Sequence, residues 1–441
     1  MKQYTAGSSA LTNLELESKS IFFRPQGPSL AEQPPSPIDV EAPYSTDRNS
    51  RTSMIRIDTS PADVGMDEEK LTLLREDIET DIESGLSDGS VILIARRGKI
   101  VMHEAIGFAD RKAGRKIKTD DVLPVMSLTK QLTAATVFRF IDRGQVTLTT
   151  RIAEVIPEFA CNGKERVTIR DTLSHQAGLP MQHPVEDWSQ GNEAYVAKIC
   201  AMPPELAADG VVNYHAGAAH AILGEVVRRL DDRNRSLTQI MADEILVPTG
   251  MTDTALTLIG RNDLADRSAP ITMCDDSKET IPQQDIERIA EICATVEFPA
   301  GGAVSTAYDQ YRFAEMFRLG GALNGVRVLS PAIIKAATTI QTGTKLSGLY
   351  KASAENNFTE PFPANIGLSF YVRGEGVFLA SMGTLSSPST FGGSGFGGQL
   401  FWVDPERQLT FVHLVVGYPQ LYKSRKRSQR LSDLVISAVS D

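Results

Sequence analysis

The chain has 441 residues, which is enough for two or three compact units with a large core. Hydrophobic residues make up 41% and charged residues 23%, as in ordinary globular proteins, and the formal net charge of −10 argues against a nucleic-acid partner. No stretch of about 18–20 residues is continuously apolar, and the N-terminus lacks the apolar run of a secretory signal. We therefore expect a cytoplasmic protein with neither a nucleic acid nor a membrane among its partners.

Residues 1–60 are predicted to form an extended or disordered arm. This segment is rich in Ser, Pro, Thr and Asn and has little hydrophobic periodicity. Its cluster of prolines between positions 25 and 37 disfavours a packed helix or sheet. Wrapping of the arm over the body of the protein or over a partner is the alternative.

The first regular elements follow this arm. A helix is predicted from about Met66 to Gly85, with acidic residues in its first turn. Two β-rich runs, 90–96 and 100–107, flank a short turn at 97–99 and predict an antiparallel hairpin.

Ser127 then opens the only Ser-x-x-Lys motif in the chain. Apolar residues at three- and four-residue steps behind it predict a helix that ends near Gly144. Lys130 should therefore lie one turn after Ser127 on the same face, with Cβ atoms about 5–6 Å apart. A serine hydroxyl needs a base to become a good nucleophile, and a lysine serves only when burial or nearby charge lowers its pKa. The pair indicates covalent catalysis, although a single such motif also arises by chance.

The pattern from about 127 to 290 is mostly helical. This segment contains Tyr214, which precedes a helix whose small residues permit close packing. Loops around 180–188 and 203–210 are expected to supply pocket walls.

The C-terminal part is predicted to contain a helix over 309–319 and then antiparallel strands. A glycine cluster around Gly393 runs into one of them, which lets a ligand approach the backbone closely. A last helix is expected from about Ser428, with the basic run 423–427 as a solvated face at its start. The predicted strands are 366–372, 376–381, 399–403 and 409–416.

These elements predict an α/β (α+β) fold in which an antiparallel sheet is flanked by helices and a mostly helical domain is inserted. Residues 61–126 and 295–441 would form the α/β domain, and 127–294 the helical domain. The pocket should lie between the two domains, with Ser127 at their boundary.

Neither a metal nor another cofactor is expected. The four cysteines have no metal-ligand spacing and give no disulfide framework, so we expect them to be reduced. Among the six histidines, His215 and His220 are five residues apart on a helix and should point to different faces.

In combination these motifs resemble the serine β-lactamase and penicillin-binding protein superfamily. Ser127 and Lys130 come first, Tyr214 follows, and Gly393-Ser394-Gly395 stands in a strand near the C-terminus. The chain looks most similar to the branch with class C β-lactamases, type-C carboxylesterases and acyltransferases. Segments 167–180 and 298–309 also look like parts of this family, and the resemblance covers about residues 62–441.

The resemblance implies a mechanism. Ser127 would attack a carbonyl to form an acyl-enzyme while Lys130 accepts its proton, directly or together with Tyr214. Tyr214 would pass the proton to the leaving group. The backbone N–H groups of Ser127 and Phe396 would form the oxyanion hole. The structural alternatives are a buried tyrosine with a satisfied hydroxyl and a glycine run that is only a tight turn.

Two departures from the family pattern bear on the substrate. Gly393 stands where relatives have Lys or His, and Ala216 stands where they have Asn. The absence of both the Lys or His and the Asn makes penicillins and peptidoglycan peptides less suitable as substrates. Neutral, more apolar acyl substrates become more suitable. His215 could instead tune Lys130 or Tyr214, or simply pack. The residues assigned to substrate binding are His215, Ser394, Gly395, Trp188 and Phe391.

We therefore predict a serine esterase or acyltransferase that acts on a small ester, thioester or amide. Its partners would be a small-molecule acyl substrate and a possible acyl acceptor, and the sequence predicts no oligomeric state. The alternatives are a non-catalytic scaffold or binding protein with the same fold, and a true β-lactamase or D,D-peptidase.

Overall fold

The computed structural model describes residues 56–181, 185–274, 283–349 and 360–441. All of them belong to one compact unit that spans 44–441. Most of the predicted arm, 1–60, lies outside the described residues. The division into an α/β domain and a helical domain stays a prediction, because this grouping does not separate 127–294 from its surroundings.

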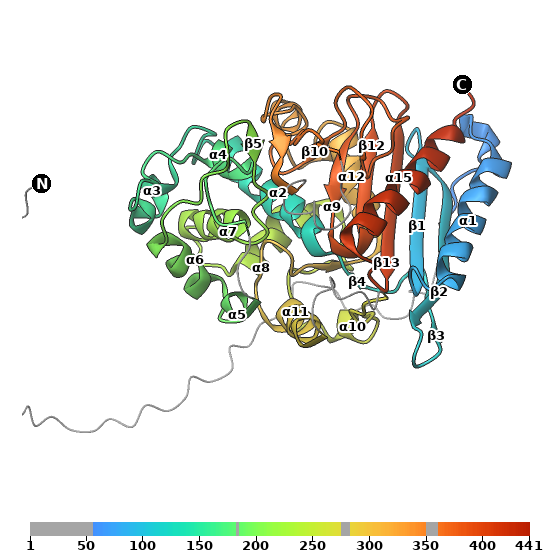
Figure 1. Ribbon diagram of the computed structural model, residues 1–441, viewed down its shortest axis with the longest axis horizontal. Coiled ribbons are helices and arrows are strands. Elements are labelled where there is room, and N and C mark those ends of the chain that lie inside the picture. Colours follow the sequence, from blue (N-terminus) through green and yellow to red (C-terminus); the bar gives the residue numbers. More distant parts are fainter. Residues whose placement is uncertain (1–55, 182–184, 275–282, 350–359) are drawn as a thin grey trace, which may run out of the picture. The chain divides into compact units, whose positions relative to one another are not determined.

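A seven-stranded antiparallel sheet forms the centre of the fold, in the order β10-β11-β12-β13-β1-β2-β3 (Figure 1). It joins strands from both ends of the chain, because β1 pairs with both β2 and β13. The predicted antiparallel sheet with flanking helices is confirmed. The strands are β1 (Gly89–Arg96), β2 (Lys99–Asp110), β3 (Arg115–Lys116), β10 (Tyr371–Val372), β11 (Phe391–Ser394), β12 (Leu400–Asp404) and β13 (Leu409–Val416).

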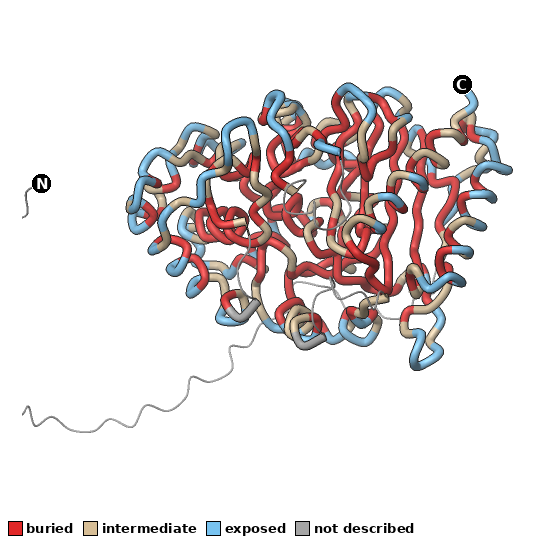
Figure 2. Tube along the Cα trace, viewed as in Figure 1, coloured by how far each residue is buried: buried red, intermediate tan, exposed pale blue. Residues whose placement is uncertain are grey.

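Both faces of the sheet are covered by helices. Along β1, Val91 and Leu93 point into one apolar cluster, while Ile92 and Ile94 point into another on the opposite face. This alternation is what a strand with two buried faces requires. Figure 2 shows the central strands buried along their length. The helices α1 (Glu68–Glu83) and α15 (Leu421–Ser437) cover one face, and α12 (Ala307–Arg318) packs on the other.

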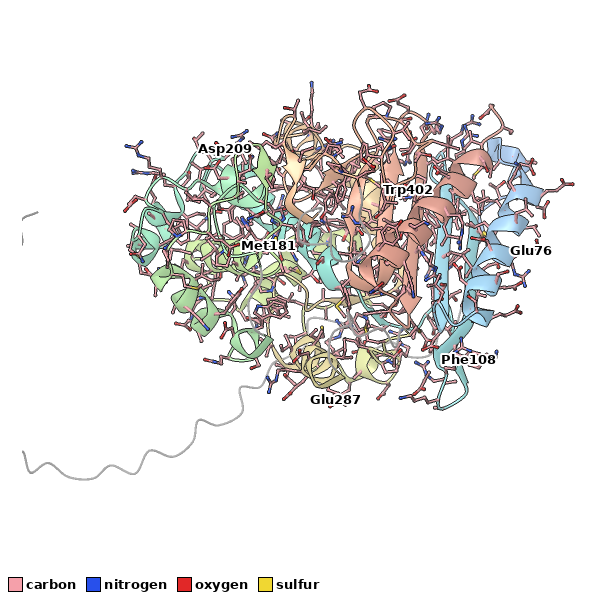
Figure 3. All side chains as sticks on the ribbon, viewed as in Figure 1. Glu76, Phe108, Met181, Asp209, Glu287 and Trp402 are labelled. Carbon is pink, nitrogen blue, oxygen red and sulfur yellow. The ribbon has the colours of Figure 1, made fainter. Side chains whose placement is uncertain are left out.

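The two terminal helices, α1 and α15, are held to the sheet and to each other by polar contacts as well as apolar ones. Trp402 of β12, labelled in Figure 3, is fully buried. Its indole Nε1 donates to Ser432 Oγ of α15 at 2.9 Å. On the same helix, Arg427 Nε donates to Asp81 Oδ2 of α1 at 2.9 Å, and both side chains are buried. Removing one member of such a buried pair is strongly destabilising, because the other charge is left uncompensated.

Most of the remaining helices lie between β3 and β10 in sequence. The helix α7 (Ala218–Leu230) packs against α2 (Thr129–Asp142), which follows Ser127. A Cβ atom at Gly224 would lie 2.9 Å from both Leu237 Cδ2 and Pro299 Cγ, so the predicted close packing is confirmed. The others are α3 (Ile152–Val155), α4 (Ile169–Leu173), α5 (Val185–Trp188), α6 (Asn192–Ala201), α8 (Leu237–Met241), α9 (Val247–Thr249), α10 (Asn262–Ala265), α11 (Gln283–Thr295) and α13 (Pro331–Ala337).

Short strand pairs connect separate parts of the chain. One of them, β4 with β6, brings the segment before Ser127 next to the segment after α11. The pairs are β4 (Leu123–Pro124) with β6 (Val304–Ser305), β5 (Val211–Val212) with β9 (Leu346–Ser347), and β7 (Ala322–Leu323) with β8 (Val326–Arg327).

Two of the predicted strands differ in the structure. The segment 376–381 forms no strand, and 366–372 contributes only the two residues of β10. The reason is a loop with left-handed glycines, including Gly374 and Gly376, that wraps around Arg373. The guanidinium of Arg373 donates hydrogen bonds to several backbone carbonyls of this loop, which would otherwise need partners on a neighbouring strand.

The last helix also begins earlier than predicted, at Leu421 rather than near Ser428. The basic run 423–427 therefore lies within the helix, whose turns send its members to different faces. Interpreting the whole run as a solvated face was wrong. Lys423 and Lys426 are exposed, but Arg427 is buried against α1.

Within the ranges that the structure describes, no helix combines the length and the apolar character needed to cross a membrane.

Candidate active site

Ser127 lies in a single 3-10 turn, η3 (Met126–Leu128), that leads directly into α2. Met126, just before it, has a φ of +50°, which non-glycine residues seldom adopt. Two hydrogen bonds to Ala303 hold this strained turn. The N–H of Val125 donates to the Ala303 carbonyl, and the N–H of Ala303 donates to Thr129 Oγ1, both at 3.0 Å. The position of Ser127 is therefore fixed by a segment distant in sequence.

The structure brings Lys130 and Ser127 together. Lys130 Nζ lies 3.2 Å from Ser127 Oγ and donates to the carbonyl of Ala300 at 2.7 Å. The lysine is only 2% exposed, and burial lowers the pKa of its amine to about 7. A substantial fraction of Lys130 is then uncharged near neutral pH and has a free lone pair for a proton. This is the arrangement expected of a serine activated by a lysine base.

Tyr214 completes the group of three. Lys130 Nζ lies 5.1 Å from the centre of its ring. Burial and the neighbouring Tyr371 raise the pKa of Tyr214 above its usual range, against the opposing effects of Ser127 and Arg425. Tyr214 is therefore a neutral phenol at pH 7, which can donate a proton but is a poor base.

Three histidines pack behind Tyr214. The ring of His175 stacks on it with centroids 4.6 Å apart, and His175 Nδ1 accepts the backbone N–H of His215 at 3.0 Å. His220 Nε2 shares a hydrogen bond of 2.9 Å with Ser369 Oγ. Burial lowers the pKa of each histidine, that of His215 to about 3, so all three are neutral. His175 contacts the ring of Tyr214 directly, and the rings of His215 and His220 pack against His175.

The described residues include no group of three or more His, Cys, Asp or Glu side chains placed to hold a metal ion.

The glycine strand β11 runs directly beside the serine turn. A Cβ atom at Gly395 would lie 2.8 Å from the Val125 carbonyl oxygen and 3.3 Å from Met126 Cβ. A Cβ atom at Gly393 would lie only 2.5 Å from Gln131 Oε1. The buried Gln131 amide therefore fills the space that a lysine or histidine at 393 would need. This explains the glycine at that position of the motif.

Phe396 follows this strand as the first residue of the short 3-10 turn η7 (Phe396–Gly398). The N–H of a first helical residue has no acceptor within its own helix and is free for a ligand. Because Gly395 packs against the residues before Ser127, the two proposed oxyanion donors come from adjacent pieces of backbone. Their role in binding an oxyanion stays a prediction.

The structure places the residues assigned to substrate binding in different surroundings. Ser394 lines a cavity beside β11, whereas His215 lines a separate cavity together with His175. Trp188 stacks on Phe298 with ring centroids 4.8 Å apart and lies against the backbone of Gly217, three residues after Tyr214. Substrate contacts of these residues stay predictions.

Phe391 lies elsewhere. Its side chain is 4% exposed and packs in the core with Phe317 and Phe370, at centroid distances of 6.3 and 6.1 Å. It is not among the residues that line the cavity beside β11, so we do not retain it in the proposed site.

Sequence reasoning missed two residues of this region, Tyr371 and Arg425. Tyr371 stacks parallel to Tyr214, with centroids 6.4 Å apart, and lines the same cavity as Ser394. Arg425 of α15 also lines that cavity. The basic run that contains Arg425 was visible in the sequence, but nothing there distinguished the member that faces the site.

Comparisons with known proteins show the family of the chain. The β-lactamase family profile matches residues 74–432. Esterase/beta-lactamase LipL of Mycobacterium tuberculosis is 26% identical over 354 aligned residues, which cover 74% of this chain and 76% of LipL. A penicillin-binding protein homolog from Caulobacter crescentus is 25% identical with a TM-score of 0.69, covering 85% of this chain and 99% of its own. A family VIII carboxylesterase has a TM-score of 0.67 at 23% identity, with coverage of 85% and 99%.

Proposed function

The chain belongs to the β-lactamase family of serine hydrolases, and we propose that it is an esterase or acyltransferase that works through an acyl group on Ser127. The observation that carries this proposal is the contact of 3.2 Å between Ser127 Oγ and the amine of Lys130, whose pKa burial lowers to about 7. A serine and a largely uncharged amine at this distance form a nucleophile with its base.

The geometry suggests a division of roles. Uncharged Lys130 takes the proton of Ser127 as the hydroxyl attacks the carbonyl carbon of the substrate. The negative charge that develops on the carbonyl oxygen is met by the N–H groups of Ser127 and Phe396. Tyr214, a neutral phenol, gives its proton to the leaving group and regains one from Lys130. Water or a bound acceptor then releases the acyl group by the reverse steps.

Two features favour esters over penicillins. Gln131 fills the space beside Gly393 that the Lys or His of the family's strand motif would need. Ala216 stands where the family's tyrosine motif has an Asn. LipL, a relative by sequence, is named both an esterase and a β-lactamase, and the solved family VIII enzyme is a carboxylesterase. We therefore expect the colorimetric cephalosporin nitrocefin to be hydrolysed weakly at most.

The proposal predicts a covalent intermediate. On mixing with p-nitrophenyl butyrate, the protein should release a burst of one p-nitrophenol per molecule and gain the mass of one butyryl group on Ser127. Both signals should be absent in Ser127→Ala and unchanged in Ser330→Ala, which alters a partly exposed serine at the start of α13. Rapid-quench mass spectrometry with peptide mapping measures both.

The same experiment separates the rival functions. A folded wild-type protein that takes up neither the butyryl group nor a fluorophosphonate probe would be a scaffold, and the enzymatic proposal would be wrong. Faster turnover of nitrocefin than of any ester would instead favour a β-lactamase.

A further inference from the structure

The short helix α4 ends with a histidine in a backbone conformation that favours glycine. The N–H of His175 donates to the carbonyl of Thr172 at 3.3 Å, and the N–H of Gln176 donates to that of Asp171 at 2.7 Å. These two bonds form a Schellman motif, in which the first residue after the helix cap is left-handed and is usually glycine. His175 occupies this position with a φ of +59°.

The side chain of His175 supplies a reason for a histidine at this position. A residue with a Cβ atom is less stable than glycine in the left-handed conformation, and residues held there cluster at active sites. The His175 side chain is 3% exposed, and its ring stacks on that of Tyr214 with centroids 4.6 Å apart. The other ring stack described for Tyr214, with Tyr371, is longer at 6.4 Å. His175 is therefore the closer of these two ring partners.

A second contact joins His175 to the backbone beside Tyr214. His175 Nδ1 accepts the N–H of His215, the residue that follows Tyr214, at 3.0 Å. The rings of His215 and His220 pack against His175 with centroids 5.3 and 5.6 Å away. His220 in turn shares a hydrogen bond of 2.9 Å with Ser369 Oγ. The ring of His175 is thus held on several sides and contacts Tyr214 through both ring and backbone.

His175 is poorly suited to act as an acid or a base itself. Burial lowers its pKa well below the usual value, and the neighbouring His215, His220 and Lys130 lower it further. The ring is therefore neutral near pH 7, and because Nδ1 accepts a hydrogen bond, the ring proton is on Nε2. The lone pair of Nδ1 is already used, so this side chain holds its neighbour rather than moving a proton.

We propose that His175 is a positioning residue, whose ring fixes the phenol of Tyr214 in the orientation that gives its proton to the leaving group. This inference rests on the proposed function, in which Tyr214 is the proton donor. A catalytic group must be held close to its productive geometry by the packing of its neighbours. The left-handed histidine at the end of α4 provides that packing.

Two esters of butyric acid separate positioning of Tyr214 from general stability. Ethyl butyrate needs a proton on its leaving alkoxide, whereas p-nitrophenyl butyrate has a leaving group that departs without one. The measured quantity is the ratio of kcat/KM for the ethyl ester to kcat/KM for the p-nitrophenyl ester. Both values come from one preparation, so the ratio cancels any loss of folded protein.

In His175→Asn the ratio should fall about 2- to 10-fold, as expected for loss of a stacked ring pair. Asparagine tolerates the left-handed conformation, and its side-chain oxygen can still accept the N–H of His215. The ring is then the main feature removed. In His175→Gly, which suits the backbone but removes the acceptor as well, the ratio should fall at least as far.

His103→Asn is the matched control. His103 is 2% exposed on β2, and its Nδ1 also accepts a backbone N–H, that of Arg56, at 3.4 Å. This variant should lose a buried imidazole and keep the wild-type ratio. A fall equal to that of His175→Asn would show a general effect of buried histidines and overturn the inference.

The pairing of His175 with Tyr214 is tested by a double variant. Phenylalanine at 214 has no proton to give, so adding His175→Asn to Tyr214→Phe should leave the ratio of Tyr214→Phe unchanged. A further fall of the same size would mean that His175 acts independently of Tyr214 and would overturn the inference.

An unchanged ratio in His175→Asn alone would also overturn it, because the ring is absent from this variant. If His175→Asn does not fold, His175→Gly decides by the same ratio. Failure of the proposed function looks different, since neither ester would then acylate Ser127 in the wild-type protein.

Discussion

Replacing Lys130 with methionine is expected to slow acylation of Ser127 by p-nitrophenyl butyrate by about 10²- to 10⁴-fold, the usual contribution of a general base. Methionine keeps the length and the apolar stem of the buried side chain but has no amine to take the proton. The Ala300 carbonyl also loses its hydrogen bond, so some stability is lost as well. The rate is measured by stopped-flow release of p-nitrophenol in a single turnover.

A second buried lysine provides the matched control. Lys164 is 1% exposed, and its amine donates to the carbonyls of Cys200 and Met202. Lys164→Met should therefore cost stability in the same way and leave the acylation rate per folded molecule almost unchanged. Equal slowing in both variants would show that Lys130 acts through stability alone, and its assignment as the base would be wrong.

Replacing Tyr214 with phenylalanine is expected to lower kcat/KM by about 10²- to 10⁴-fold for an alkyl ester and by much less for a p-nitrophenyl ester. An alkoxide leaves only after it is protonated, whereas p-nitrophenolate leaves without a proton. The variant keeps the ring that stacks on His175, so the fold around the site should persist. Steady-state kinetics with ethyl butyrate and p-nitrophenyl butyrate measure the difference.

Tyr311→Phe is the control for loss of a buried phenol. Tyr311 lies on α12, and its hydroxyl donates to the carbonyl of Gly98 at 3.4 Å, in the hairpin turn between β1 and β2. Both esters should react with this variant at nearly the wild-type rate. An equal loss for both esters in Tyr214→Phe would contradict a role in leaving-group protonation.

The features that could be predicted from the sequence depend on local patterns. The hairpin of β1 and β2 was predictable because two β-rich runs flank a glycine turn, and it closes around Arg97 and Gly98, both with positive φ. Ser127 and Lys130 were predictable because residues three apart on a helix share a face. Their contact at 3.2 Å confirms that inference.

The features that were missed depend on contacts between distant segments. The strand expected over 376–381 is absent because Arg373 draws the backbone of this loop around itself, which no periodicity records. Arg425 and Arg427 are two residues apart in one basic run, yet one faces the cavity and the other pairs with Asp81. Their difference depends on where α15 begins and on which helix lies beside it.

The lowered pKa of Lys130 also follows from the tertiary structure. The motif says only that an amine lies near a hydroxyl, but the value of about 7 is caused by burial beneath segment 298–303. The same burial raises the pKa of Tyr214. Opposite shifts in neighbouring groups separate the base from the acid, and this is why we assign proton removal to Lys130.

The most direct test of this account is the pH dependence of the acylation rate of the wild-type protein, measured in single turnovers with p-nitrophenyl butyrate. Only the unprotonated amine accepts a proton, and the pKa of Lys130 is about 7. The rate should therefore rise about tenfold per pH unit below pH 7 and level off above it. A rate that is independent of pH across this range, or that falls as the pH rises, would contradict an uncharged Lys130 as the base for Ser127.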